Sequence, residues 1–563
     1  MKKTLSIIMA LCMILSVCAF SVAAAPEGTA ISSAAEFAAM AADGKYYLAN
    51  DIALNASYAE SFKGTLDGNG KTITVSAPMF AAIDGATIKN LNLVGFIDGA
   101  AANTAAVAVT ASGAVTFENI ASKVTITNAT GAASILAVAD PTASVTAIGC
   151  VNEGSISGTG TVGGIIGLIN NNVNTVTACE NRGDLLSTGG QCGGIVSAMG
   201  VKNGVAPKDT ITITDCVNYA NVTGDNAQSG GILAFLCGGV EIKNCVNYGK
   251  ILNTNNKAGG IFGTSIKSTK NVCAISIENC INYGEVCASK VVAGIAARLG
   301  RAVSVAGMNY FIKNCINYGD INVYSDIAYE GVTLYMGGIV GYSYANSQTP
   351  ANGVINCINL GNINADRSYL DAASKLYVGG IVSYVNSVNY VCQNNINAGI
   401  LSVNGAPTAV ANITYNVKLD AVEAEKNNYS IHSIEGATDG LTNFATMSQL
   451  KSGEVAYLIN EAAGETIYYQ AIGTDDAPVL AAAEDGSNTI LKNANGTFSN
   501  PVKEPEVTEP EVTEPETTEP EVTEPETTEP VTPPTTGDST VIFAVIAVIS
   551  ILGVAVVAKR REF

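Results

Sequence analysis

Short runs in which apolar and polar residues alternate cover most of the chain, and Gly, Asn and Asp interrupt them. The clearest run is Ile-Lys-Asn-Cys-Val-Asn-Tyr-Gly-Lys-Ile at residues 242–251, and it recurs along the sequence. A period near two, rich in Val, Ile, Thr and Tyr and bounded by turn residues, is typical of short β-strands. The pattern therefore predicts strands and tight turns rather than helical repeats.

Two phrases alternate along this region. The first phrase has a cysteine and, two residues later, an asparagine. The column of the cysteines is apolar: it begins at Leu91 and Ile120, continues through the cysteines, and ends at Asn395. The second is Gly-Gly-Ile or a close variant, as at residues 259–261. Fixed phrases with spacers of variable length indicate a repeat architecture whose spacers are loops. The pairs of the first phrase are Cys150 with Asn152, Cys179 with Asn181, Cys216 with Asn218, Cys245 with Asn247, Cys280 with Asn282, Cys315 with Asn317, and Cys357 with Asn359.

A stack of coils satisfies this pattern. One repeat cannot bury its own apolar face, whereas coils stacked about 4.8 Å apart give each strand parallel neighbours and form one continuous core. We therefore predict an all-β fold, a right-handed parallel β-helix (a solenoid of about ten coils). In such a stack, each column of the repeat lies above itself from coil to coil.

The columns lead to three predictions about the turns. The cysteines should point inward as buried free thiols, because stacked parallel Cβ vectors would strain a disulfide. The asparagines should stack and hydrogen-bond both to local backbone and to one another. The turn should close at a position that needs a positive φ, which glycine adopts readily. Ala220 is the one exception in this column, whose other residues are Gly154, Gly183, Gly249, Gly284, Gly319, Gly361 and Gly399.

Five further cysteines lie off the ladder. Whether they pair is left open by the sequence; they are Cys192, Cys237, Cys273, Cys287 and Cys392.

Several copies of the second phrase resemble the GLUG motif of parallel β-helix surface proteins from Gram-positive bacteria. They read Gly-Ile-Ile-Gly at 164–167, Gly-Ile-Phe-Gly at 260–263 and Gly-Ile-Val-Gly at 338–341. Residues 47–52 and 62–70 are also similar to the opening of these proteins. The resemblance covers residues 45 to 400 and implies an extracellular adhesin-like module, without indicating a particular ligand.

The N-terminal region is predicted to hold a leader and a cap. Residues 1–25 have two lysines, an apolar run and three alanines, the order of a secretory signal peptide. Residues 26–85 are predicted to form the N-terminal cap and the first strands. A capping box at Ser33 begins a short helix whose Phe37 and Met40 plug the first coil.

The repeats are predicted to fill residues 86–405. A small α+β capping module should follow at residues 406–500, because a solenoid needs an atypical terminal unit to cover its last coil. From residue 501 the sequence changes to Glu-Pro-Glu-Val-Thr and Glu-Pro-Glu-Thr-Thr repeats. Regular prolines and repelling glutamates prevent a packed core, so residues 501–532 are predicted to form a disordered stalk.

The acidity of the chain lies largely in this stalk. Eleven glutamates between residues 504 and 529 supply about half of the net charge of -20. The charge argues against a nucleic-acid partner.

Residues 533–563 carry a Pro-Pro-Thr-Thr-Gly phrase, an apolar run at 541–558 and a basic tail. This order resembles the LPxTG-like sorting signal of Gram-positive surface proteins. The resemblance implies that a sortase-type transpeptidase cuts between Thr536 and Gly537 and joins Thr536 to peptidoglycan. The residues of the predicted signal are Pro533, Pro534, Thr535, Thr536 and Gly537.

The alternative is that residues 541–558 remain as one transmembrane helix that anchors the protein in the membrane. In both cases the protein is predicted to be extracellular and anchored by its C-terminus to the cell wall or plasma membrane.

Catalytic chemistry is sparse in this sequence. His432 is the only histidine, and acidic residues do not recur at one position of consecutive coils as a pair of glycosidase carboxylates would. There is no Asp-rich calcium repeat and no Cys-x-x-Cys pair. The sequence therefore predicts no enzyme, no metal and no cofactor, with a polysaccharide-active lyase or glycoside hydrolase as the alternative.

One tyrosine per coil follows the asparagine column in four consecutive repeats. The four rings are predicted to stack at the coil spacing. Two interpretations are open: an aromatic surface for a glycan or protein ligand, or a ladder that only packs the turn. These tyrosines are Tyr219, Tyr248, Tyr283 and Tyr318.

Together these features predict a cell-surface-anchored, adhesin-like β-helix that presents a binding surface for glycans or for a host or matrix protein. A polysaccharide-active enzyme and a passive cell-wall or surface-layer component are the alternatives.

Overall fold

Strands make up nearly all of the regular structure in the part of the chain that the computed structural model describes. That part comprises residues 26–100, 102–170, 173–200, 210–265, 274–300, 309–325, 330–344, 352–386, 390–405, 407–416, 425–433, 437 and 442–501. The predicted signal peptide, the sorting signal with its helix at 541–558, and all of the predicted stalk except residue 501 lie outside it. Among the described residues, no helix is long and apolar enough to span a membrane.

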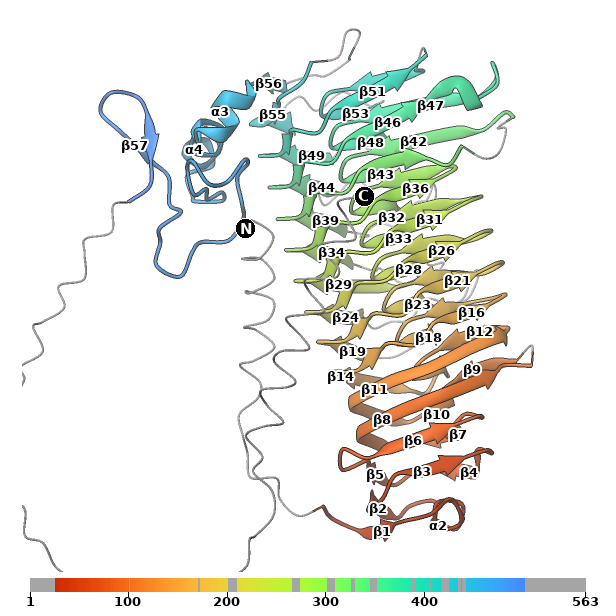
Figure 1. Ribbon diagram of the computed structural model, residues 1–563. Helices are drawn as coiled ribbons and strands as arrows, with labels where there is room; N and C mark the ends of the chain where they lie inside the picture. The colour runs from red at the N-terminus through yellow and green to blue at the C-terminus, as the bar shows by residue number, and fades with distance from the viewer. Residues whose placement is uncertain are drawn as a thin grey trace, which may run out of the picture. The chain divides into compact units, whose positions relative to one another are not determined.

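Three parallel sheets, named A, B and C here, run through the stack (Figure 1). Sheet B has twelve described strands: β4 (Tyr58–Phe62), β7 (Phe80–Asp84), β10 (Ala108–Ser112), β13 (Leu136–Ala139), β18 (Ile166–Ile169), β23 (Val196–Met199), β28 (Leu233–Leu236), β33 (Phe262–Ser265), β38 (Ala296–Leu299), β43 (Val340–Tyr344), β48 (Val382–Asn386) and β53 (Thr414–Asn416). Sheet C has ten described strands: β9 (Asn103–Ala105), β12 (Gly131–Ala133), β17 (Val162–Gly163), β22 (Cys192–Gly193), β27 (Gln228–Gly230), β32 (Lys257–Gly259), β37 (Val291–Ala293), β42 (Thr333–Gly337), β47 (Lys375–Gly379) and β52 (Ala409–Ala411).

Sheet A is the largest, because two or three short segments of most coils join it. Its 34 described strands are β1 (Thr29–Ile31), β2 (Lys45–Leu48), β3 (Ile52–Leu54), β5 (Thr65–Asp67), β6 (Thr72–Val75), β8 (Thr87–Asp98), β11 (Ala114–Ala129), β14 (Ser144–Ile148), β15 (Val151–Asn152), β16 (Ile156–Gly158), β19 (Asn174–Thr177), β20 (Glu180–Asn181), β21 (Leu185–Ser187), β24 (Thr210–Thr214), β25 (Val217–Asn218), β26 (Val222–Gly224), β29 (Gly239–Lys243), β30 (Val246–Asn247), β31 (Ile251–Asn253), β34 (Ala274–Glu278), β35 (Ile281–Asn282), β36 (Val286–Ala288), β39 (Asn309–Lys313), β40 (Ile316–Asn317), β41 (Ile321–Val323), β44 (Asn352–Ile355), β45 (Ile358–Asn359), β46 (Ile363–Asp366), β49 (Tyr390–Gln393), β50 (Ile396–Asn397), β51 (Leu401–Asn404), β54 (Glu425–Lys426), β55 (Asn428–Ser430) and β56 (Thr442–Phe444).

One coil shows how the sequence produces this arrangement. The chain runs through β24, β25 and β26 of sheet A, then β27 of sheet C and β28 of sheet B, and it begins the next coil at β29. Corresponding residues are in register, as Ile213 with Ile242 and Asn218 with Asn247. The all-β stack of parallel strands, the architecture of a parallel β-helix, is therefore confirmed. Its right-handed winding stays a prediction.

The described strands of the stack exceed about ten coils: they include the region predicted to hold the first strands, before residue 86, and they continue after residue 405. The twelve strands of sheet B begin at β4 and end at β53, and sheet A continues to β56. The additional strands lie before Leu91 and after Asn395, the first and last positions that the repeat pattern marked.

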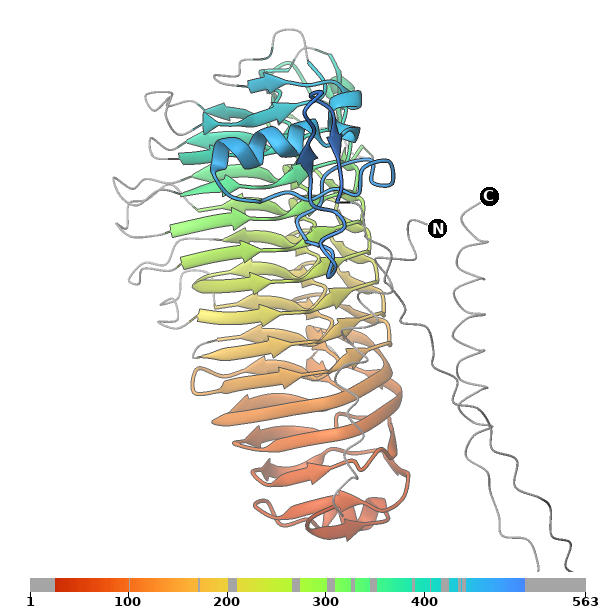
Figure 2. The same cartoon turned by 90° about the vertical axis from the view of Figure 1, so that its left-hand side faces the viewer.

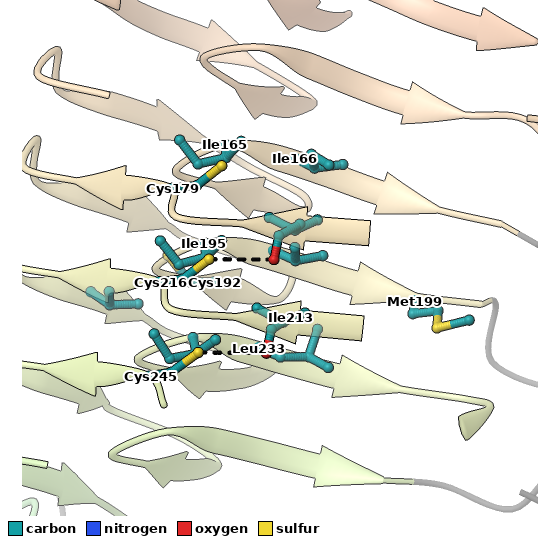
Figure 3. Close-up of a cluster of buried hydrophobic side chains, with 14 of the residues drawn as sticks. Ile165, Ile166, Cys179, Cys192, Ile195, Met199, Ile213, Cys216, Leu233 and Cys245 are labelled. Atoms are coloured by element: carbon teal, nitrogen blue, oxygen red, sulfur yellow. Dashed lines mark hydrogen bonds between the residues drawn. The ribbon is translucent and has the colours of Figure 1, made fainter. Parts of the chain in front are cut away.

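The ladder cysteines lie in the core, as predicted. Cys179, Cys216 and Cys245 follow one another beside Ile165 and Ile195 (Figure 3). The Cys216 thiol donates a hydrogen bond to the Val176 carbonyl at 3.5 Å, and burial raises its pKa above the ordinary value. The ladder thiols are all buried and free; they are Cys150, Cys179, Cys216, Cys245, Cys280, Cys315 and Cys357.

The prediction of a positive φ in the glycine column is wrong. The left-handed residue instead precedes the cysteine, as at Asn244 with a φ of 55°, and asparagine tolerates that region better than most residues. The glycines are required by close backbone approach. A Cβ added to Gly249 would lie 1.8 Å from the Ala220 carbonyl oxygen of the preceding coil.

A short helix covers the first coil. α2 (Ala34–Ala38) begins where Ser33 Oγ accepts a hydrogen bond from the Glu36 amide. Phe37 and Met40 are buried, and the Phe37 ring lies 5.6 Å from the Phe80 ring. The predicted plug is therefore present.

The C-terminal module contains α3 (Met447–Lys451), α4 (Glu454–Ala463) and the antiparallel pair β57 (Leu491–Lys492) and β58 (Phe498–Ser499). It lies beside the later strands of sheet A (Figures 1 and 2). Its buried residues form one cluster with outward residues of three successive coils, Ile316, Ile358 and Ile396. The sequence predicted a cap over the last coil, whereas the module packs against the side of the solenoid.

Candidate functional site

The four predicted tyrosines, called here the tyrosine stripe, occupy the same place in four consecutive coils. Each lies just after a two-residue strand of sheet A: β25, β30, β35 and β40. Each backbone amide donates to an asparagine carbonyl of the preceding coil, as Tyr248 N to Asn218 O at 2.7 Å. The backbone therefore fixes the spacing of the rings.

Beneath the stripe runs a buried ladder of asparagine side chains. Each Nδ2 donates to Oδ1 of the next coil, as Asn247 to Asn282 at 2.7 Å, and Asn247 Nδ2 also donates to the Gly249 carbonyl at 2.9 Å. The two predicted kinds of hydrogen bond, to local backbone and to the asparagine of a neighbouring coil, are thus confirmed. The ladder consists of Asn152, Asn181, Asn218, Asn247, Asn282, Asn317, Asn359 and Asn397.

The ladder ends where the sequence changes. Asn397 pairs in register with Ser430 rather than with another asparagine, and the buried Nδ2 of Asn397 has no hydrogen-bond partner. A carboxamide at each coil therefore matters, because its loss leaves a buried donor unsatisfied.

A second ladder on the outside runs with the opposite polarity. Asn279 Nδ2 donates back to Asn244 Oδ1 at 3.3 Å, and Asn244 Nδ2 donates to Asp215 Oδ1 at 3.0 Å. Asp215 ends this row, and a carboxylate suits that place because it only accepts hydrogen bonds. The two ladders hold the turn between them and make the stripe a rigid feature.

The rings of the stripe stack face to face. Their centroids are 5.3, 4.9 and 4.8 Å apart, and the planes of neighbouring rings differ by 2°, 2° and 10°. The predicted stacking is confirmed. Each inner ring has a neighbour over both faces, so the stripe presents ring edges and hydroxyl groups to solvent.

Charged groups mark both ends of the stripe. The Arg182 guanidinium lies 5.5 Å from the Tyr219 ring centroid and forms an ion pair with Glu180 at 2.6 Å. At the other end, burial raises the pKa of Tyr318, and Tyr283 and the Asp475 carboxylate add to the rise. The stripe therefore runs from an ion pair to the edge of the C-terminal module.

The hydroxyls of the stripe are protonated at neutral pH. Burial, with Tyr283 and Tyr219 as neighbours, raises the pKa of Tyr248 to about 12. Tyr219 and Tyr318 remain 40% and 38% exposed. A bound molecule would therefore meet neutral phenols that can donate as well as accept hydrogen bonds.

The structure shows a second aromatic surface, called here the tyrosine cluster, which the sequence analysis missed. Tyr335 and Tyr342 lie on β42 and β43, on either side of the Gly337–Gly338 turn, with ring centroids 4.9 Å apart. The cluster is half-buried and comprises Tyr335, Tyr342, Tyr377, Tyr384 and Tyr415. Its signal was a Tyr-x-Gly-Gly-Ile-Val-x-Tyr phrase at residues 335–342 and 377–384.

Among the residues that the structure describes, the other candidates do not assemble into a site. The sorting-signal residues Pro533 to Gly537 lie outside the described part of the chain. His432 accepts a hydrogen bond from Ser430 Oγ at its backbone carbonyl, at 2.8 Å. Within the described residues, no group of three or more His, Cys, Asp or Glu side chains is placed to hold a metal ion.

No family model matches the chain, and no curated protein matches it. Among solved structures, it is similar to a candidate immunoglobulin A1 protease from Bacteroides ovatus, with 16% identity over 56% of this chain and 86% of that chain, and a TM-score of 0.29. A structure named IgA1 Protease is 18% identical over 50% of this chain, with the same TM-score, and the match spans 20% of that chain.

These names contradict the prediction that the protein is not an enzyme, and that prediction is withdrawn. Acidic residues do not recur at one position of consecutive coils, but catalytic residues can be carried by a scaffold at a single place. A TM-score of 0.29 gives no argument for protease activity in this chain.

Proposed function

We propose that the protein is a cell-surface-anchored, adhesin-like β-helix that presents a binding surface for glycans or for a host or matrix protein. The tyrosine stripe carries the proposal, because half-exposed aromatic side chains at one position of four consecutive coils are typical of interaction surfaces. The inner asparagine ladder already accounts for the turn, so the fold does not require aromatic rings outside it.

Anchoring is part of the proposal. Secretion through the leader at 1–25 and attachment through Thr536 to peptidoglycan, by a sortase-type transpeptidase, would display the solenoid outside the cell. Retention of residues 541–558 in the membrane would display it on the same side.

A passive role in the cell wall or surface layer is the second candidate. The observation that favours it is the stacking itself, because rings that cover one another can serve the turn alone.

An array experiment tests the proposal. Residues 26–503, which lie within the first of two compact units, Met1–Lys503, are applied to glycans, mucin and matrix proteins, and released products are assayed in parallel. We expect saturable binding that falls at least tenfold when Tyr248 and Tyr283 are both changed to Ala. Binding that is unchanged by this pair, or no binding at all, would contradict the proposal, and released oligosaccharide would favour the polysaccharide-active alternative.

A further inference from the structure

We propose that the tyrosine stripe and the aliphatic column beside it dock an amphipathic helix of a protein partner. The column consists of Val217, Val246 and Ile281, and the seven residues together are called the docking strip. The inference rests on the proposed binding function and names the class of partner.

The faces of the inner rings of the stripe are covered by their neighbours. A sugar that stacks on an aromatic side chain needs a free ring face, but Tyr248 has rings 5.3 and 4.9 Å away on its two sides. What remains is a row of edges and neutral hydroxyls. Such a surface suits the side chains and polar groups of a protein better than the flat face of a sugar.

An aliphatic column runs beside the stripe. Val217, Val246 and Ile281 point outward and are half-buried, two residues before each tyrosine. Each coil therefore contributes one aliphatic and one aromatic side chain to the same surface. The strip has apolar groups across its width, which favours an apolar partner surface.

The strip is continuous with a surface that the chain itself already covers. The same two columns continue in later coils as Ile316, Ile358 with Leu360, and Ile396 with Ala398, and the C-terminal module packs on them. Ile281 packs against this buried cluster, which contains its in-register neighbour Ile316. The docking strip is therefore the uncovered part of one continuous apolar surface.

The module shows what kind of group covers that surface. α4 buries Val455, Ala456 and Ile459 in the shared cluster, while Glu454 begins it and Glu461 lies exposed. This is an amphipathic helix. Successive turns of a helix are about 5.4 Å apart, close to the ring spacings of 4.8 to 5.3 Å, so a helix along the strip can place one apolar residue over each coil.

A peptide of this chain tests the inference. Residues 446–470, which contain α3 and α4, are synthesised with a fluorescent label and titrated with residues 26–503 while anisotropy is recorded. Val246→Lys and Tyr248→Lys each introduce a charge into the strip. Leu252→Lys is the matched control, because Leu252 is a half-buried outward aliphatic residue of the same coil that lies on β31, away from the strip.

We expect the peptide to bind and each strip variant to weaken binding roughly tenfold, with the Leu252 variant close to wild type. Failure of the peptide to bind, or binding that ignores both strip variants, would overturn the inference. If glycans bind on the array and compete at the strip while the peptide does not bind, the proposed function stands and the helix partner is wrong.

Discussion

Two neighbouring columns of the same turn behave in opposite ways. The inner column is asparagine in eight consecutive coils and is fully buried. The outer column, one residue further along the chain, changes from Glu153 and Arg182 to four tyrosines and then to Leu360 and Ala398. The difference shows which constraints the fold imposes and which it leaves free.

The inner column cannot vary because each amide is a partner of the next. Removing one carboxamide leaves buried polar groups without a hydrogen bond in two coils. The outer column changes where its surroundings change, and the tyrosines give way to aliphatic residues where the C-terminal module covers the surface. The fold therefore leaves the outer column free to carry a functional surface.

The largest expected effect comes from the glycine that closes the turn. Gly249→Ala would place a Cβ 1.8 Å from the Ala220 carbonyl oxygen, so the backbone of one coil must move. We expect a loss of about 4 kcal/mol in the free energy of unfolding, measured by chemical denaturation. Ala220→Gly, in the preceding coil, is the control and should change stability by about 1 kcal/mol or less. A loss below about 1 kcal/mol for Gly249→Ala would contradict the close approach.

The inner asparagine comes next. Asn247→Ala removes the acceptor of Asn218 and the donor to Asn282, so we expect a loss of about 2 to 3 kcal/mol. Asn256→Ala removes a more accessible asparagine of the same coil and should cost about 0.5 kcal/mol or less. Equal losses of stability for the two variants would contradict the claim that the buried asparagine ladder stabilises the fold more than other asparagines do.

The outer tyrosine should matter least for stability. Tyr248→Ala keeps both asparagine ladders and the backbone hydrogen bonds of the turn, so we expect a loss of about 1 kcal/mol, from ring contacts with Tyr219 and Tyr283. Thermal melts of Tyr248→Ala and Asn247→Ala, recorded under the same conditions, show which variant loses more stability. A loss larger than that of Asn247→Ala would make the stripe part of the structural core.

The pH dependence of the stripe gives a smaller signal. The pKa of Tyr248 is raised from 10.0 to about 12 in the folded chain, so this group favours folding below the ordinary pKa of tyrosine. That contribution should fade as pH rises from about 10 to 12. Titration of phenolate absorbance, with Tyr248→Phe as the comparison, should show one phenol fewer in the upper part of this range. An unchanged titration curve would contradict the shift.

The sequence contained enough information for the stack and for the buried columns. Repetition of Cys245 and Asn247 at one spacing implies that each lies above its counterparts, and in-register strands follow from that. The stacked rings of the stripe were predictable for the same reason.

Other features depend on how distant segments meet. Asn244 and Gly249 both suit a left-handed turn in sequence terms, and only the distance to the preceding coil decides that the glycine serves close approach. The module at the side and the tyrosine cluster around Tyr335 arise from contacts across coils or sheets, which a single repeat does not encode.

The most direct test of the central claim is to measure stability and binding together on Tyr248→Ala and Asn247→Ala. Each variant of residues 26–503 is melted and then titrated, below its melting temperature, with the ligand found on the array. We expect Tyr248→Ala to lose binding at a cost of only about 1 kcal/mol in stability, and Asn247→Ala to lose about 2 to 3 kcal/mol and keep binding. If Tyr248→Ala instead binds normally and melts far below wild type, the stripe is a packing ladder and the account of its function is wrong.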